Sequence, residues 1–239
     1  MADRRDELLA RAAGTPGFLP LEEALALSNA AERAARSAKG PLLEIGSYLG
    51  RSTLFLAAGV VASGRDDVTL YSLDHHRGSE EMQAGWPHHD PALVDPLNNK
   101  MDSLPHWRRH LEQAGAEDLV VGIVGRSATV ARDWTTTLSL VFIDGGHGEE
   151  VAWADYAGWA PKVATGGLLV IHDVFENPAE GGRPPYECYL DAISTGAFVE
   201  DRGAGSGSLR VLVRPVAKSV EVAVPPASAS AARSTAAAE

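Results

Sequence analysis

The sequence has almost no cysteine and no long apolar run. Its single cysteine, Cys188, cannot form an intrachain disulfide, as is usual in a reducing compartment. No stretch approaches the roughly 18 apolar residues that cross a membrane, and residues 1–7 lack the apolar core of a secretory signal. We therefore expect a cytoplasmic protein with no membrane partner, in which Cys188 is a packing residue rather than a nucleophile.

Positive charge is also scarce. The 239 residues include 21 Lys and Arg against 32 Asp and Glu, which gives a net charge of −11. This balance excludes the sequence-wide basic surface that would recruit nucleic acid. With 45% hydrophobic residues the composition is that of a globular protein. The length suits one sizeable α/β domain better than two.

Short apolar runs alternate with helix-like stretches over residues 41–215, which is typical of a mostly parallel β-sheet with helices on both faces. Two helices are expected as a cap on this domain over residues 1–40, the second from residue 20 to 37. Residues 216–239 are rich in Ala and Ser, and we expect a disordered tail there. The seven expected strands cover residues 42–46, 68–74, 119–124, 139–143, 167–172, 198–201 and 208–213.

The last two expected strands differ from the others. Only a short Gly-Ala-Gly-Ser-Gly link separates them, so they should pair as an antiparallel hairpin and not through a helix. The sequence therefore predicts a mostly parallel sheet that ends in one antiparallel hairpin.

A glycine-containing turn follows the first expected strand. The segment LLEIGSYLGRST, residues 42–53, starts as an apolar run, turns at Gly46 and Gly50, and opens into a helix-like stretch. A residue without Cβ is needed where a ligand approaches the backbone closely, and N–H groups at a helix start suit a carboxylate or phosphate. The pattern favours a nucleotide-like ligand with an anionic end. The alternative is an ordinary strand-to-helix turn.

Polar residues stand at the ends of five expected strands, and open α/β sheets bind ligands at that edge. Asp74 ends the second strand, and its carboxylate could accept hydrogen bonds from both hydroxyls of a ribose. The alternative is that Asp74 caps a turn or a helix. The strand ends also bring Glu44, the Gly125-Arg126-Ser127 segment, Asp144 and the His172-Asp173 pair to the same edge.

In this order the motifs resemble those of class I S-adenosylmethionine-dependent methyltransferases. The resemblance covers about residues 40–214 and rests on EIGSYLGRST at 44–53, Leu73-Asp74, Gly125-Arg126-Ser127-Ala128 and FIDGGH at 142–147. It implies a Rossmann-like α/β fold, a seven-stranded sheet with a terminal antiparallel hairpin. An NAD-binding domain is the competing interpretation, but its Gly-x-Gly-x-x-Gly pattern is absent, since Gly46 is followed only by Gly50.

The same resemblance implies an S-adenosylmethionine site. Gly46, Ser47 and the helix start would hold the methionine portion, Asp74 the ribose, and Ser127 with its neighbours the adenine. The residues implied for the cofactor are Glu44, Ile45, Gly46, Ser47, Tyr48, Ser52, Asp74, His75, Arg126, Ser127 and Asp144.

A second group of residues points to a divalent cation. Asp144 and Asp173 end neighbouring strands and could share a hard cation such as Mg²⁺. This arrangement resembles metal-dependent sugar O-methyltransferases, which place an acidic pair where this chain has His172-Asp173. The resemblance implies Asp144, His172 and Asp173 as ligands of Mg²⁺ or, because of the imidazole, Mn²⁺. His172 could instead support the ligands from outside, with Glu176 as a replacement.

His147 is the predicted catalytic base. It lies three residues beyond Asp144, and an imidazole there could take the proton of an acceptor hydroxyl that the cation has made more acidic. Asp144 and His147 are therefore the predicted catalytic residues. The alternative is that His147 caps the next helix.

A histidine-rich insertion over residues 75–112 is expected to form a substrate lid. It contains six of the eight histidines together with Trp86 and Trp107. Aromatic faces combined with polar groups suit a carbohydrate. A zinc site is the alternative, although no cysteine accompanies the histidines and only His106 and His110 have the spacing of a structural site.

The acceptor is implied by the resemblance and not by spacing or composition. The resemblance extends to enzymes of mycobacterial methylmannose polysaccharide biosynthesis and implies a short 3-O-methylated mannoside, methylated at its reducing-end hydroxyl. A catechol or an antibiotic precursor is the alternative acceptor, and a non-catalytic S-adenosylmethionine-binding protein is the alternative function. The alanine-rich N-terminal helices could also supply a homodimer contact.

Overall fold

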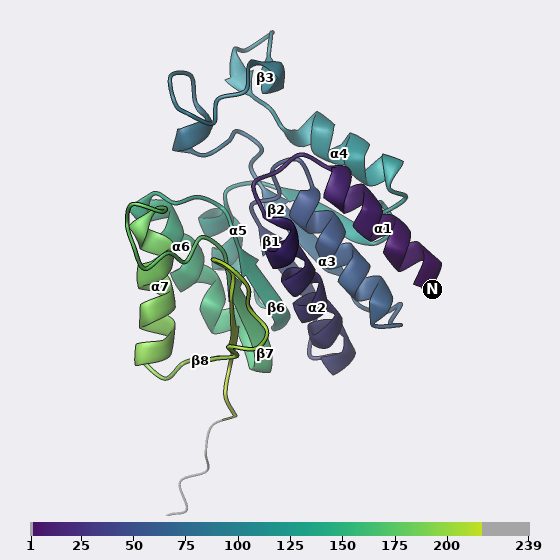
Figure 1. Ribbon diagram of the computed structural model, residues 1–239, viewed down its shortest axis with the longest axis vertical. Coiled ribbons are helices and arrows are strands. Elements are labelled where there is room, and N and C mark those ends of the chain that lie inside the picture. The colour runs from purple at the N-terminus through teal and green to yellow at the C-terminus, as the bar shows by residue number, and fades with distance from the viewer. Residues whose placement is uncertain (1, 217–239) are drawn as a thin grey trace, which may run out of the picture.

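The expected strands assemble into one seven-stranded sheet in the computed structural model, which describes residues 2–216 (Figure 1). Five strands are parallel and lie in the order β5-β2-β1-β6-β7. β9 pairs antiparallel with both β7 and β8, so the predicted terminal hairpin is confirmed. The strands are β1 (Leu42–Ile45), β2 (Leu70–Asp74), β5 (Val120–Val124), β6 (Leu138–Ile143), β7 (Val163–Ile171), β8 (Val199–Glu200) and β9 (Arg210–Val213).

The apolar runs are continuous because the sheet is covered on both faces. Alternate residues of β1 show this: Leu42 belongs to the core on one face, while Leu43 and Ile45 belong to the core on the other. β6 is buried along its whole length and divides in the same way. The sheet therefore separates two apolar layers, with one set of helices packed on each.

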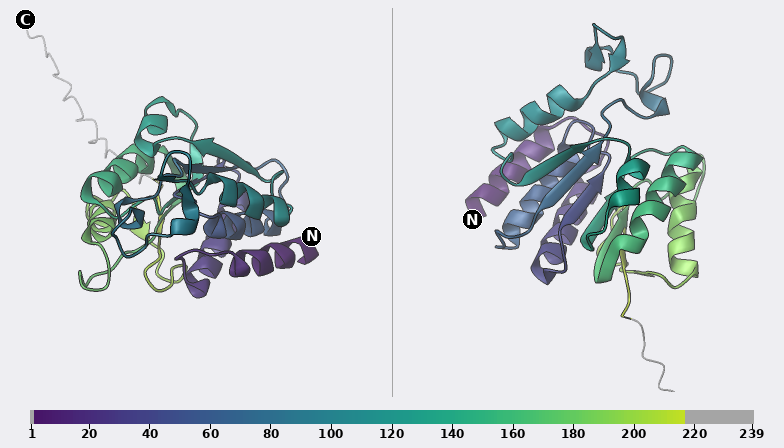
Figure 2. Two further views of the ribbon diagram at one scale, coloured as in Figure 1. Left: turned by 90° about the horizontal axis from the view of Figure 1, so that it is seen from above. Right: turned by 180° about the vertical axis from the view of Figure 1, so that it is seen from behind.

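Four helices contribute to the first layer and three to the second (Figure 2). The first set is α1 (Ala2–Gly14), α2 (Leu21–Ser37), α3 (Arg51–Ala62) and α4 (Leu104–Gln113). The second set is α5 (Ser127–Asp133), α6 (Glu149–Trp159) and α7 (Arg183–Ser194). No helix among residues 2–216 is long and apolar enough to cross a bilayer.

The two N-terminal helices pack into the main core. Leu8 of α1 and Leu27 of α2 are buried in the same apolar layer as Phe55 of α3. The guanidinium of Arg51 donates hydrogen bonds to carbonyl oxygens of the last turn of α1 and of the α1–α2 connection, including that of Leu19. These contacts fix the N-terminal segment against the start of α3, beside the carboxyl end of β1.

The histidine-rich insertion divides into two parts. Residues 75–103 stand away from the sheet at the top of Figure 1 and contain the 3₁₀ helices η1 (Glu80–Met82) and η2 (Pro91–Leu93) and the short strands β3 (Val94–Asp95) and β4 (Lys100–Met101). α4 instead packs on the sheet, with Trp107 almost fully buried. The predicted tail, residues 216–239, lies outside the described residues apart from Val216.

Candidate functional site

A cavity of about 500 Å³ lies at the carboxyl ends of β1, β2, β6 and β7. Its floor is formed by the turns that follow these strands. Its walls come from the α1–α2 connection at Gly17–Leu19 and from the insertion, including Trp86. The strand order brings these turns together because β1 lies between β2 and β6, with β7 next to β6. The cavity thus lies at the carboxyl edge of the sheet, where the sequence predicts a ligand site.

The glycine turn is organised around Asp74. The carboxylate oxygen Oδ2 of Asp74 accepts hydrogen bonds from the backbone N–H groups of Ser47, at 3.0 Å, and Tyr48, at 2.9 Å. Gly46 has a φ of +87°, and a Cβ there would overlap the backbone carbonyl of Asp144. The glycine is therefore required by the neighbouring strand end, a reason that differs from the ligand approach that the sequence suggested.

The predicted cofactor residues fall into two groups. Gly46, Ser47, Tyr48, Ser52, Asp74, His75 and Asp144 line the cavity, whereas Glu44, Ile45, Arg126 and Ser127 do not. Glu44 lies under the floor, where it accepts hydrogen bonds from Thr53 and Ser72. The Ser127 hydroxyl accepts a hydrogen bond from the indole of Trp159.

Three residues predicted as catalytic or cation-binding converge on one wall of the cavity. Asp144, His147 and Asp173 each offer one ligand atom, and these atoms lie within 4.8 Å of one another. The Nε2 atom of His147 lies 2.6 Å from Oδ2 of Asp173. Asp173 adopts a left-handed backbone conformation, with a φ of +56°. Such strained positions gather at functional sites.

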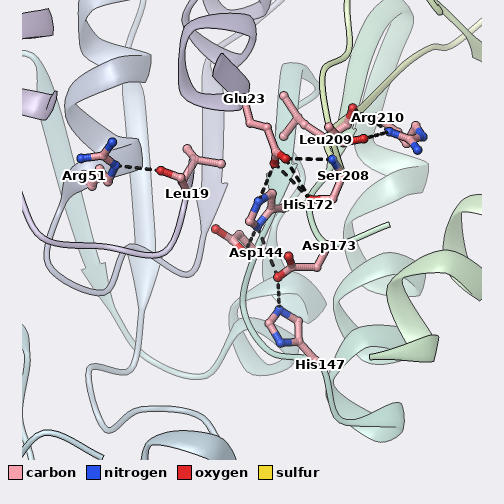
Figure 3. Close-up of polar contacts among 11 residues, drawn as sticks. Leu19, Glu23, Arg51, Asp144, His147, His172, Asp173, Ser208, Leu209 and Arg210 are labelled. Carbon is pink, nitrogen blue, oxygen red and sulfur yellow. Dashed lines mark hydrogen bonds and ion pairs between the residues drawn. The ribbon is translucent and has the colours of Figure 1, made fainter. Parts of the chain in front are cut away.

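His172 lies behind this group, not within it. Its buried ring has Nε2 2.8 Å from Oε2 of Glu23 and Nδ1 3.0 Å from Oδ1 of Asp144 (Figure 3). Both ring nitrogens thus lie within hydrogen-bond distance of carboxylates, although His172 also lines the cavity. His172 is not one of the three converging residues, and its contact with Asp144 fits the alternative in which it supports a ligand from outside. Glu176 is not part of the converging group.

Opposite charges dominate the electrostatics of this wall. Burial alone would lower the pKa of His147, but its hydrogen bond to Asp173 and the charges of Asp173, Asp144 and Glu81 raise it to about 9. Burial opposes ionisation of Asp173, yet its contacts with His147 and His172 hold its pKa well below the usual range. The His147 imidazole is therefore charged at neutral pH in this arrangement.

The donor set of this wall fits a divalent cation. Two carboxylates from neighbouring strand ends provide the oxygen ligands that Mg²⁺ and Mn²⁺ prefer, and an imidazole is also acceptable to Mn²⁺. Among the described residues, this is the only group of three acidic, histidine or cysteine side chains with such geometry. The zinc alternative in the insertion has no such support, and Nδ1 of His110 contacts the carbonyl oxygen of Leu49.

Three residues of the site were absent from the sequence prediction. Glu23 reaches His172 from α2, and Glu81 of the insertion places Oε2 3.4 Å from Nδ1 of His147. Phe18 contributes to the cavity wall, where its ring lies 5.5 Å from that of Tyr48. None of them stands at a strand end. The available signal for Phe18 was a large aromatic residue in a Gly- and Pro-containing connection.

Comparisons with known proteins show which family and which solved structures this chain resembles. A family model described as a methyltransferase domain matches residues 43–174. That range begins in β1 and ends just after Asp173, so it contains the glycine turn and the converging carboxylates.

Solved structures with the same fold include three O-methyltransferases. TomG from Streptomyces achromogenes, involved in tomaymycin synthesis, has 16% identity and a TM-score of 0.57, with 83% of this chain and 82% of that one covered. NovP has 17% identity and a TM-score of 0.57, with 84% of each chain covered. The Bacillus cereus enzyme, solved with S-adenosylhomocysteine, has 14% identity and a TM-score of 0.56 over 88% and 90%.

Proposed function

The chain belongs to the methyltransferase-domain family, and on that basis we propose that it transfers the methyl group of S-adenosylmethionine to a hydroxyl oxygen, assisted by Mg²⁺ or Mn²⁺. The observation that carries the proposal is the convergence of Asp144, His147 and Asp173 on the cavity that also contains the glycine turn and Asp74. This arrangement brings a candidate base, candidate cation ligands and a candidate cofactor pocket to one edge of the sheet.

Methyl transfer from a sulfonium is an in-line displacement. The acceptor oxygen forms a bond to the methyl carbon while the carbon–sulfur bond breaks, and the hydroxyl proton must leave. His147 is the residue proposed to take that proton, because its imidazole lines the cavity next to Asp144 and Asp173. When bound, a divalent cation would lower the pKa of the acceptor hydroxyl. Asp144 and Asp173 are the residues proposed to hold it.

His147 must be neutral to act as a base. Its pKa of about 9 reflects the unneutralised carboxylates around it, because Asp173, Asp144 and Glu81 all favour the charged imidazole. A cation between Asp144 and Asp173 would oppose this effect by offsetting their charge. In this proposal the protonation state of His147 therefore depends on whether a cation offsets the charges of Asp144 and Asp173.

The proposed acceptor is a sugar. Exposed aromatic side chains, Phe18 and Trp86, line the cavity together with His75 and His88. Aromatic faces pack on the apolar faces of a pyranose, and the polar groups can bind its hydroxyls. Within this class we propose the reducing-end hydroxyl of a short 3-O-methylated mannoside, following the sequence resemblance. An antibiotic-type acceptor is the alternative that the names of TomG and its tomaymycin pathway suggest.

The proposal is tested by incubating the protein with S-adenosylmethionine, Mg²⁺ or Mn²⁺ and a matched panel of acceptors, with mass spectrometry of the products. The panel contains 3-O-methylmannosides, unmethylated mannosides and catechols. A 14-dalton gain on a mannoside that requires the added cation supports the full proposal, since one methyl replaces one hydrogen. A gain on catechols alone would contradict the sugar assignment. A cation-independent rate after chelation would contradict the metal assignment.

A further inference from the structure

A carboxylate from outside the matched family domain reaches the candidate site. Glu23 belongs to the first turn of α2, and it is only 6% exposed. Its carboxylate accepts hydrogen bonds from the Ser208 backbone N–H, at 2.8 Å, and from the Ser208 hydroxyl, at 3.0 Å. A Cβ on Gly207 would overlap Glu23, so the turn before β9 is shaped around this carboxylate. Glu23 is therefore held in one place by two distant parts of the chain.

The same carboxylate faces one side of the His172 ring. Nε2 of His172 lies 2.8 Å from Glu23, while Nδ1 lies 3.0 Å from Asp144 and 3.3 Å from Asp173 (Figure 3). Both nitrogens can donate to these carboxylates only when each carries a hydrogen. Rotation of the ring away from Glu23 would also break the contact with Asp144. The orientation of one carboxylate is thus coupled to the other through a buried ring.

We propose that Glu23 is a positioning residue for Asp144 and that it acts through His172. In this arrangement Glu23 fixes the imidazole, and the imidazole holds one oxygen of Asp144 so that the other is free to face the cavity. The inference rests on the proposed function, because it assumes that Asp144 contributes to a cation site. Groups that orient metal ligands from outside typically change metal affinity 10–100-fold when they are mutated.

A purely structural role for Glu23 makes a different prediction. Glu23 also ties α2 to the turn before β9, and loss of that contact would lower stability without a specific effect on the site. Cation affinity separates the two roles, because it reports on Asp144 while stability reports on packing. Glu23→Gln suits this test, since the glutamine side chain has the same shape and keeps one oxygen for the Ser208 N–H.

The matched control is Glu22→Gln. Glu22 is the neighbouring residue in the same helical turn, but it is exposed. Both variants remove one negative charge from the start of α2, so any general loss of attraction for a cation is shared. Mn²⁺ affinity is measured by electron paramagnetic resonance of the free ion, and S-adenosylhomocysteine affinity by calorimetry. The second measurement shows whether the cavity remains folded.

We expect Glu23→Gln to weaken Mn²⁺ binding about tenfold or more, with S-adenosylhomocysteine affinity within about twofold of wild type. Glu22→Gln should change neither. Adding His172→Gln to Glu23→Gln should weaken Mn²⁺ binding no further than His172→Gln alone, because both residues act on the same contact. Additive losses would contradict action through His172.

Failure of this inference can be told apart from failure of the proposed function. If the wild type binds both Mn²⁺ and S-adenosylhomocysteine while Glu23→Gln binds Mn²⁺ equally well, Glu23 does not position Asp144 and the proposed function stands. If the wild type binds S-adenosylhomocysteine but no Mn²⁺, the cation assignment and this inference both fall. If it binds neither ligand, the proposed function itself is wrong.

Discussion

Two buried glutamates illustrate how much the environment of a single residue decides. Glu23 is surrounded by donors, and although burial opposes its ionisation, its contacts with His172 and Ser208 lower its pKa. Glu44 is fully buried in β1, where Oε2 accepts two hydrogen bonds and Oε1 has no partner. Burial raises the pKa of Glu44 to about 7, although the neighbouring hydroxyls of Ser52, Ser72 and Thr53 act to lower it.

The raised pKa of Glu44 predicts that the free energy of unfolding depends on pH through this residue. Because its folded-state pKa, about 7, lies above the ordinary value of 4.5, the protonated Glu44 carboxyl stabilises the folded protein at low pH. This stabilisation is lost as the pH rises from about 4.5 through 7, by an amount on the order of 3 kcal/mol. Glu44→Gln should remove this loss, so its stability relative to wild type should increase between pH 5 and 8 in urea unfolding. Parallel stability curves for the two proteins would contradict the assignment.

His147 carries the clearest kinetic prediction. His147→Ala should lower kcat by roughly 10²–10⁴, the range expected for a general base, while S-adenosylhomocysteine affinity stays close to that of wild type. The matched control is His106→Ala, because His106 lies on α4 and is not part of the cavity wall. A rate for His147→Ala within a few-fold of the control would mean that another group takes the proton.

Residues at strand ends were predictable, and residues that reach them from elsewhere were not. Asp144 directly follows β6 and Asp173 is the second residue after β7, so the parallel sheet alone places them together. Glu23 contacts His172 across 149 positions of sequence, and nothing in the spacing of α2 shows which of its acids turns inward. The sequence also does not show that both nitrogens of His172 lie against carboxylates.

At the scale of elements, the turn after β1 depends on the end of β6. The backbone carbonyl of Asp144 occupies the space where a Cβ on residue 46 would lie, and the φ of Gly46 is +87°. The turn directs two N–H groups at Asp74, which joins the carboxyl ends of β1 and β2. A glycine at this position is therefore a requirement of strand packing as well as of any ligand.

Gly46→Ala should consequently be strongly destabilising. The unfavourable φ alone costs about 1–3 kcal/mol, and the overlap with Asp144 adds to that because backbone on both sides must move. Gly14→Ala is the control, since no heavy atom lies within 4 Å of a Cβ there and its φ is not positive. Chemical unfolding should show a large loss for the first variant and little change for the second. Equal stabilities would contradict the geometry of the turn.

The boundaries of the elements were less predictable than their order. Residues 68 and 69 were expected in a strand, but β2 begins at Leu70, and β7 begins four residues earlier than expected, at Val163. The register between β6 and β7 shifts between Leu138 and Leu140, an irregularity that no alternation of apolar residues reveals. α4 was expected in the lid, yet Trp107 anchors it to the sheet.

At the scale of the whole molecule, the N-terminal helices are part of the domain that carries the site. α2 supplies Glu23 and buries Leu27 in the layer that also holds Phe55 of α3. The overall architecture was predictable because alternating runs specify the sheet. The packing of residues 1–40 into the main core was not predictable, because the amphipathic pattern of a helix does not identify the surface against which it packs.

A pair of leucines on α2 tests this integration. Leu27 is fully buried, whereas Leu25 is 40% exposed on the same helix. Leu27→Ala should lower the free energy of unfolding by about 2–5 kcal/mol in a single transition, while Leu25→Ala should have a much smaller effect. A separate early transition in the Leu27→Ala protein would indicate that α2 unfolds independently as a detachable cap.

The central claim is that this sheet edge binds S-adenosylmethionine for methyl transfer. Its most direct test is calorimetric titration of the wild-type protein with S-adenosylhomocysteine, with and without Mg²⁺, followed by the same titrations with NAD. We expect one S-adenosylhomocysteine site per chain and no NAD binding. NAD binding, or the absence of S-adenosylhomocysteine binding under both conditions, would contradict it.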